Sequence, residues 1–343
     1  MTPASETRRR ACASSALVLS LCGLTLSGSA LAADPPYLAV IEKIGGAVGF
    51  FAEDGRPLAQ VKVGSFPHEG ALSRDGRFLY VSNNGVLWMT EDSQGTNSIS
   101  VVDVRAMKKA ADIDLGRFHR PHGMALVPGS GQILATTERP FGLIMVDWST
   151  RQVIRDYDVK GKSPHMVFPM PDGEWVYVSD TDSDSVVAIQ LKTGNAKVIP
   201  TGARPQGAAL SPAGDRLYVA CADGNRISII DTRKQEVVGT IPTGKGPARI
   251  AITPDGTTLV YNLGFEPGVG FADVASGRQT AMVPLSGRPL SLTMTRDGRR
   301  AFAGVQDQDK VFFISVAQRK VERVLATPKG SGPDPAIPLE SWP

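Results

Sequence analysis

A unit of about 42 residues recurs along this chain, and it limits the fold more than any other feature. The clearest copy runs from Arg204 to Ile241. In that copy an apolar segment follows Pro205, and a turn rich in Pro and Gly reverses the chain. Leu217–Ala220 and Ile227–Ile230 then read as two short strands, and a Val-rich segment ends the unit. Short β-branched segments between such turns are typical of strands, so each unit is predicted to form a four-stranded antiparallel sheet.

The same turn and the same second strand recur in the rest of the chain. The turn recurs at 74–76, 171–173, 254–256 and 296–298, with a looser copy at 128–129. The second strand recurs at Tyr37–Val40, Phe78–Val81, Ile133–Thr136, Trp175–Val178, Thr258–Tyr261 and Ala301–Ala303. Seven four-stranded units without a helical apolar period predict an all-β fold, a seven-bladed β-propeller.

The first unit lacks its own first strand, and the end of the chain offers a replacement. The segment 332–334 repeats the pattern of glycine and proline that opens other units, and the apolar stretch Ala336–Leu339 follows it. We therefore expect the C-terminal segment to supply the inner strand of the first blade. Closing the ring in this way removes the open sheet edges that a linear array would expose.

The strand sequences resemble a known repeat family. Leu217-Tyr218-Val219-Ala220 followed by Ile227-Ser228-Ile229-Ile230-Asp231 is similar to the YVTN-type β-propeller repeat. The resemblance extends over nearly all of the chain after residue 32. Relatives of that architecture include haem d1 domains, surface-layer proteins, lactonase-like hydrolases and quinoprotein subunits. It therefore implies a fold and no single activity.

The first 32 residues have the pattern of a cleaved signal peptide. Three arginines at 8–10 precede an uncharged apolar stretch, and Ala30-Leu31-Ala32 places small residues at the cleavage positions. We expect residues 1–32 to be removed and residues 33–343 to form a single propeller domain in the periplasm or outside the cell. Thr7-Arg8-Arg9 resembles the start of a twin-arginine signal, but Ala11 and Cys12 match the large apolar residues expected next poorly, so the general secretory route is favoured.

Charge and cysteine content exclude several classes of function. The chain has a formal net charge of +3, and loss of the signal peptide would lower it to about +1. Such a balance does not favour binding to nucleic acid. No segment after residue 32 is apolar over the length that a membrane span requires. Only Cys221 remains after processing, so no internal disulfide is expected.

The residue after the proline that opens each unit occupies the same place in every repeat. The prolines that define this position are Pro67, Pro121, Pro164, Pro205, Pro247, Pro289 and Pro333. The residues that follow them, in ring order, are Asp334, His68, His122, His165, Gln206, Ala248 and Leu290. Because each lies where the chain enters an inner strand, all seven are expected to surround one mouth of the central channel.

Three of the four histidines of the chain occupy these positions on successive blades. Convergent imidazoles are suited to a transition metal, and three histidines with an open position are typical of catalytic metal sites. We therefore predict that His68, His122 and His165 bind one metal ion, with Cu or Fe favoured over Zn. Asp334 is a candidate fourth ligand, or a partner that fixes the tautomer of a histidine ring.

Two other interpretations of the histidines stay open. They can hold a haem-type cofactor or an anion, or they can have a structural role, bonded to water and backbone. The rest of the ring is divided: Gln206 is polar, whereas Ala248 and Leu290 form an apolar arc. This arrangement suits a small, partly apolar substrate, for which Gln206 and Leu290 are candidate contacts.

Loops after the second strands are expected to open on the same face as the histidines. The longest of these loops carries Trp88 and Met89, candidates for a lid or a substrate wall, and Glu91, a candidate base. Glu138 lies in the corresponding loop of the next blade and is a second candidate for proton transfer. His119 precedes His122 by three residues and is a candidate substrate contact. The loop can equally be a decoration that covers the neighbouring blade.

Three functions compete at this stage. The first is a metal-dependent enzyme of the oxidoreductase type, acting on a small-molecule substrate, with a periplasmic redox protein as a further candidate partner. The second is a propeller that binds a protein, another ligand or a tetrapyrrole without catalysis. The third is a lactonase-like hydrolase, which only the resemblance in fold supports.

Overall fold

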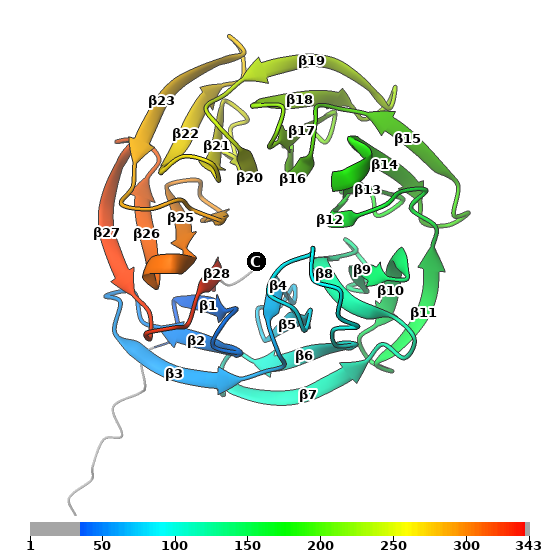
Figure 1. Ribbon diagram of the computed structural model, residues 1–343, viewed down its shortest axis with the longest axis vertical. Coiled ribbons are helices and arrows are strands. Elements are labelled where there is room, and N and C mark those ends of the chain that lie inside the picture. Colours follow the sequence, from blue (N-terminus) through cyan, green and yellow to red (C-terminus); the bar gives the residue numbers. More distant parts are fainter. Residues whose placement is uncertain (1–34, 340–343) are drawn as a thin grey trace, which may run out of the picture. The chain divides into compact units, whose positions relative to one another are not determined.

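A computed structural model describes residues 35–339, in which each sequence unit forms one antiparallel sheet of four strands. The seven sheets are arranged as blades around a common axis (Figure 1). The predicted fold class, a seven-bladed β-propeller, is therefore confirmed. The predicted signal peptide, residues 1–32, lies outside the described residues. Among the described residues, no helix has the length and the apolar character needed to cross a membrane.

The blades have equivalent strands. The innermost strands are β28 (Pro333–Pro338), β4 (Pro67–Leu72), β8 (His119–Leu126), β12 (Pro164–Pro169), β16 (Pro205–Leu210), β20 (Pro247–Ile252) and β24 (Ser291–Met294). The second strands are β1 (Leu38–Glu42), β5 (Phe78–Asn83), β9 (Ile133–Arg139), β13 (Trp175–Asp180), β17 (Arg216–Cys221), β21 (Thr258–Leu263) and β25 (Arg300–Val305).

The third and fourth strands complete each sheet toward the outside. The third strands are β2 (Ala47–Phe51), β6 (Ser98–Asp103), β10 (Phe141–Asp147), β14 (Ser185–Gln190), β18 (Arg226–Asp231), β22 (Gly268–Asp273) and β26 (Lys310–Ser315). The outer strands are β3 (Pro57–Lys62), β7 (Lys108–Asp114), β11 (Gln152–Tyr157), β15 (Ala196–Pro200), β19 (Glu236–Pro242), β23 (Arg278–Pro284) and β27 (Lys320–Ala326). Two short 3₁₀ helices, Thr181–Ser183 and Gln306–Gln308, follow second strands.

The C-terminal strand closes the ring as the sequence predicts. Strand β28 pairs antiparallel with β1, from Leu38 opposite Pro338 to Glu42 opposite Pro333. In Figure 1 the red strand β28 lies beside the blue strand β1. The first blade is thus built from both ends of the described chain and, like the other six, has four strands.

Apolar side chains of adjacent blades pack together and hold the ring. Leu79 and Ile99 in the second blade are fully buried, as are Ile133 and Ile144 in the third. Each buried aliphatic side chain of this size contributes about 1.5–3 kcal/mol. The continuous core explains why the fold needs no disulfide, and the thiol of Cys221 is buried and free.

Six of the inner strands contain a break in register just after their first proline. The breaks lie between Pro67 and Gly70, Pro121 and Met124, Pro164 and Val167, Pro205 and Ala208, Pro247 and Ile250, and Pro333 and Ala336. Such a bulge leaves residues out of the hydrogen-bonded ladder and changes the direction of their side chains. The three predicted metal-binding histidines lie in three of these bulges.

Candidate functional site

A hydroxyl group on the second strand ties each histidine bulge to the next blade. Ser82 Oγ accepts a hydrogen bond from the backbone N–H of Glu69 at 3.0 Å and donates to the carbonyl of His122 at 2.8 Å. Thr136 Oγ1 donates in the same way to the carbonyl of His165 at 2.7 Å. The backbone that carries each of these two histidines is therefore fixed by the preceding blade.

One cavity contains all seven positions of the predicted ring. Its volume is about 310 Å³, and it lies at the channel mouth where the inner strands begin. Its lining comprises Lys43, His68, Leu87, Trp88, Met89, Thr90, His122, His165, Arg204, Gln206, Ala222, Gly246, Ala248, Arg249, Gly264, Phe265, Leu290 and Asp334. The register read from the prolines therefore placed these side chains correctly relative to one another.

The three histidine rings are adjacent and buried. The ring centroids of His68 and His122 are 4.0 Å apart, and those of His122 and His165 are 4.4 Å apart. Burial holds the pKa of all three imidazoles well below the usual value, and the neighbouring histidines and cations lower it further. All three rings are therefore neutral at pH 7.

An acceptor faces the Nδ1 atom of each ring. Glu138 Oε1 is 2.8 Å from His122 Nδ1, and the carbonyl oxygen of Gln206 is 3.4 Å from His165 Nδ1. Asp334 Oδ2 is 3.7 Å from His68 Nδ1. A carboxylate or a carbonyl can only accept, so His122 and His165 carry the ring proton on Nδ1 and the lone pair on Nε2. His68 Nδ1 makes no hydrogen bond with the described residues, and the Lys43 ammonium, 3.2 Å from Nε2, places the His68 lone pair on that atom.

The Nε2 atoms differ in their surroundings. His122 Nε2 is buried and has no hydrogen-bond partner, whereas His68 Nε2 lies 3.2 Å from Lys43 Nζ. As the side chains stand, no group of three or more His, Cys, Asp or Glu residues within 35–339 has the arrangement of a metal site. Asp334, predicted as a fourth ligand, accepts from Gln306 Nε2 at 2.6 Å and faces the Nδ1 side of His68.

Glu138, a predicted catalytic residue, lies behind the histidines and does not line the cavity. Its Oε2 pairs with Arg120 Nη2 at 2.6 Å, and its Oε1 accepts from Asn84 at 3.1 Å as well as from His122. Burial raises the pKa of this carboxyl group, and the Arg120 guanidinium opposes that rise. The geometry makes Glu138 a residue that positions His122.

The long loop of the second blade forms one wall of the cavity. Arg120 holds it from below, through Nη2 to the Met89 carbonyl at 2.9 Å and Nη1 to the Glu91 carbonyl at 2.8 Å. Trp88 stays 51% exposed at the rim, with Lys43 Nζ 5.3 Å from its ring centroid. Glu91, the other predicted base, is exposed, and its carboxylate accepts from the Trp88 N–H at 2.8 Å instead of lining the cavity.

Of the predicted substrate contacts, four line the cavity and one does not. Gln206 and Leu290 line the cavity, as do Trp88 and Met89. His119 does not: it lies at the start of β8, half-buried and opposite Arg139 of β9. Its position three residues before His122 therefore does not bring it to the cavity.

Four charged residues of the site are absent from the sequence prediction. Arg249, Lys43 and Arg204 line the cavity, and Glu69 lies beside it, paired with Arg249. Glu69 and Arg249 both occupy the second position after the opening proline, so the same register would have found them. Lys43 follows the second strand of the first blade, and nothing in the repeat distinguishes it.

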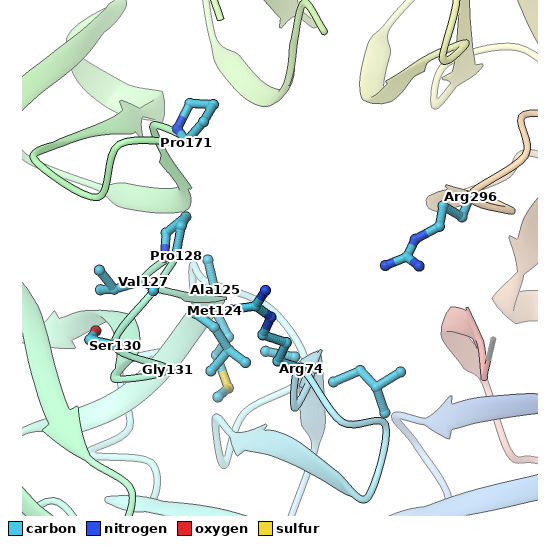
Figure 2. Close-up of a pocket in the computed structure, with 14 residues that line it drawn as sticks. Arg74, Met124, Ala125, Val127, Pro128, Ser130, Gly131, Pro171 and Arg296 are labelled. Atoms are coloured by element: carbon cyan, nitrogen blue, oxygen red, sulfur yellow. The ribbon is translucent and has the colours of Figure 1, made fainter. Parts of the chain in front are cut away.

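The other end of the channel holds a wider pocket of about 950 Å³ (Figure 2). It is lined by the ends of the inner strands and by the turns that follow them, including Met124 and Pro171. Arg74 and Arg296 extend toward this opening from different blades. No histidine lines this pocket.

The fold and the cavity together define a class: a seven-bladed β-propeller with a histidine-lined cavity at one mouth of its channel. Residues 122–286 match the YNCE-like beta-propeller family. This match and the seven blades bear out the predicted resemblance to β-propeller repeat proteins. A comparison of the sequence with curated proteins found no match.

Solved structures share the fold at low sequence identity. A functionally unknown protein from Desulfotomaculum acetoxidans DSM 771 is similar with a TM-score of 0.75 and 15% identity, over 88% of this chain and 98% of that chain. Kuenenia stuttgartiensis hydrazine synthase is similar with a TM-score of 0.65 and 18% identity, over 76% and 86%. The dihydro-heme d1 dehydrogenase NirN in complex with DHE is similar with a TM-score of 0.64 and 16% identity, over 87% and 65%.

Proposed function

We propose that His68, His122 and His165 bind one transition-metal ion through their Nε2 atoms, and that the protein uses this ion in oxidoreductase chemistry on a small molecule. The observation that supports this proposal best is the common orientation of the rings. The Nδ1 atoms of His122 and His165 face acceptors, and Lys43 donates to His68 Nε2, so the lone pair of each neutral imidazole is on Nε2. Histidine ligands of metals are held in this way in proteins generally.

The other residues of the cavity favour redox chemistry over hydrolysis. Hydrolysis on zinc ordinarily needs a nearby general base. Among the described residues, Asp334 is the one carboxylate that lines the cavity, and it is already bonded to Gln306. The two glutamates proposed as bases lie outside the lining. Copper or iron is therefore favoured, with zinc as the alternative.

Metal binding requires one rearrangement. Lys43 Nζ lies against His68 Nε2, and a lysine ammonium and a metal ion cannot share one lone pair. The long side chain of Lys43 has a second partner in Asp334, whose Oδ2 is 3.6 Å from Nζ. A shift of Nζ toward that carboxylate would free His68 for the metal.

In our proposal the activity lies outside the cytoplasm, because residues 1–32 have the pattern of a cleaved signal peptide. Redox chemistry also needs an electron acceptor or donor, so a periplasmic redox protein is a suitable partner. The volume of the cavity is near the lower end of the range for ligand pockets, about 300 Å³, so the cavity suits a small substrate.

Elemental analysis of untagged protein tests the proposal. We expect about one equivalent of Cu, Fe or Zn per chain, and His122→Ala should lose nearly all of it because one of three ligands is removed. His119→Ala is the matched control, since this fourth histidine lies outside the cavity, and it should keep its metal. Full metal content in His122→Ala, or no metal in the wild type after reconstitution, would contradict the proposal.

A second candidate is the binding of a tetrapyrrole without catalysis. The specific observation in its favour is the set of cations in the cavity, Lys43, Arg204 and Arg249, which can pair with the carboxylates of such a ligand. The similarity in fold to the NirN complex with DHE adds to it. An intense visible absorption band that persists after treatment with a chelator would favour this candidate over the metal.

A further inference from the structure

The pocket of about 950 Å³ at the other end of the channel, here called the wide pocket, lies where the regular contact between neighbouring turns is interrupted. In the third to sixth blades, the turn after the inner strand begins with a proline. An atom of this proline lies within 4 Å of the place that a Cβ would take on the turn glycine of the next blade. The successive pairs are Pro128 and Gly173, Pro171 and Gly214, Pro212 and Gly256, and Pro254 and Gly298. In these four contacts proline and glycine close the gap between turns.

Arg74 takes the place of this proline in the second blade, and the gap to the third blade stays open. A Cβ on Gly129 of the next turn would meet no atom within 4 Å outside its own chain neighbours. A Cβ on Gly131 would meet only Trp148 Nε1, at 4.0 Å. Arg74, Gly129 and Gly131 all line the wide pocket. The pocket therefore includes a gap that the repeat fills elsewhere, with an arginine at its edge.

Two arginines line the wide pocket, and no carboxylate of the described residues does. Arg296 begins the turn of the seventh blade as Arg74 begins that of the second, and in Figure 2 both side chains extend toward the same opening. The aspartates that follow them, Asp75 and Asp297, accept hydrogen bonds from hydroxyl groups of their own turns. Among the described residues the side chain of Arg74 has no ion pair or hydrogen bond. This guanidinium is thus available to an anion.

The other walls of the wide pocket are largely apolar. They include the side chains of Leu72, Met124, Leu126, Val127, Pro128 and Pro171. A second pocket, of about 440 Å³, shares Arg74 and Leu126 with the first and extends past Phe78 and Trp148. Trp148 is 48% exposed, so aromatic surface is open to a ligand beside the arginine. A volume of 950 Å³ is near the upper end of the range for ligand pockets, about 1,000 Å³.

We propose that the wide pocket binds an organic anion with an apolar body of about ten carbon atoms. Arg74 binds the acidic group, because a guanidinium matches a carboxylate or a phosphate with two parallel hydrogen bonds. Arg296 adds a second positive charge at the same opening. The apolar body lies in the gap between the second and third blades, against Leu126 and Trp148. This site goes beyond the proposed function, since it needs neither the histidines nor a metal.

Equilibrium dialysis with three naphthalene compounds tests the proposal. The probes are 2-naphthoate, 2-naphthyl phosphate and the neutral 2-naphthamide. We expect at least one of the two anions to bind at one site per chain, about tenfold or more tightly than the amide, because only an anion gains a charged hydrogen bond. The affinity should fall as salt is added, since the arginines are exposed. The anion that binds more tightly identifies the acidic group, and either result supports the proposal.

Variants at exposed positions locate the bound anion. Arg74→Gln should weaken it by about tenfold or more, and Arg296→Gln by a smaller factor. Trp148→Ala should weaken the anions and the amide alike, by about threefold, because it removes apolar surface only. Two controls should bind like the wild type. Arg105→Gln removes an exposed arginine of the same blade that lines neither pocket, and Arg204→Gln removes a cation of the histidine cavity.

Three results would overturn the proposal: no preference for either anion over the amide, equal affinity of Arg74→Gln and the wild type, or a loss of binding in Arg204→Gln alone. The last of these would place the anion in the histidine cavity. Failure of all three compounds to bind would also overturn it, and sedimentation would then show whether a second copy of the chain covers the pocket. Treatment with a chelator should change none of the affinities, so these results leave the proposed metal site untouched.

Discussion

The two ends of the channel are built from the same seven inner strands, but they differ in how regularly their side chains repeat from blade to blade. We call the end with the pocket of about 950 Å³ the wide end and the end with the histidine cavity the narrow end. At the wide end the turns are alike: Ser73 Oγ donates to Asp75, and Thr253 Oγ1 donates to Asp255 in the equivalent turn. Thr295 repeats the contact in the last blade. At the narrow end the equivalent positions hold different side chains from blade to blade.

This difference separates residues that maintain the fold from residues that adapt it. A turn must reverse the chain in every blade, so the same hydrogen bonds recur. In six blades the position after the opening proline lies in a bulge, where its backbone is out of the regular ladder. Its identity can therefore vary without harm to the sheet, and a polar cluster can form on one arc.

The largest expected effect concerns two glycines at different depths of the channel. A Cβ on Gly123, beside the histidines, would lie 2.3 Å from the His165 carbonyl oxygen, which belongs to the backbone of the next blade. A Cβ on Gly70, nearer the wide end, would meet the Ile337 Cδ1 methyl at 2.7 Å, the end of a flexible side chain. Gly123→Ala should lower the free energy of unfolding by about 3 kcal/mol or more, and Gly70→Ala by about 1 kcal/mol.

Urea unfolding followed by tryptophan fluorescence measures both values. Equal losses for the two variants would show that the narrow end is no more tightly packed than the wide end. Gly70→Ala is also the control for replacing a glycine by alanine in an inner strand, and circular dichroism should show that this variant folds.

The repeat made most of this fold predictable. Proline and glycine mark where each unit opens and turns, and the β-branched segments between them could only be strands. Gly332, Pro333 and the apolar residues after them even predicted the strand that closes the ring. These features are local in sequence, and the backbone responds to them locally.

The repeat register, defined by the opening prolines, could predict only those site residues that occupy equivalent positions in the blades. It grouped His68 and His122 correctly because each follows its own proline. It could not pair Glu69 with Arg249, since the two residues are 180 positions apart and meet only across the channel. Nor could it show that Glu138, expected in a loop, lies in β9 beside β8 and pairs with Arg120.

The second prediction concerns pH and the narrow end. Burial lowers the pKa of the three histidines in the folded state, while the unfolded value is about 6.5. Above that pH both states are neutral. As pH falls below it, the unfolded state takes up protons that the folded state cannot, so metal-free protein should lose about 1 kcal/mol per histidine between pH 6.5 and 5.5.

The matched variant His165→Gln isolates one histidine. Glu69 and Glu138, whose pKa burial raises, act in the opposite direction and are common to both proteins. The variant should therefore lose about 1 kcal/mol less than the wild type over this range. Identical losses in urea unfolding at the two pH values would mean that His165 can be protonated in the folded state.

The last prediction distinguishes the two glutamates near the narrow end. Glu138→Gln weakens the acceptor that fixes the His122 tautomer, so metal affinity should fall by about 10- to 100-fold. Glu91→Gln, whose side chain meets only the backbone of its own exposed loop, should leave affinity unchanged. Competition with a chelator of known affinity measures both variants. Two-bond ¹H–¹⁵N correlations report whether His122 keeps its Nδ1 proton, a signal that a general loss of stability would not change. Equal affinities with an altered tautomer would show that the metal does not depend on His122 Nε2.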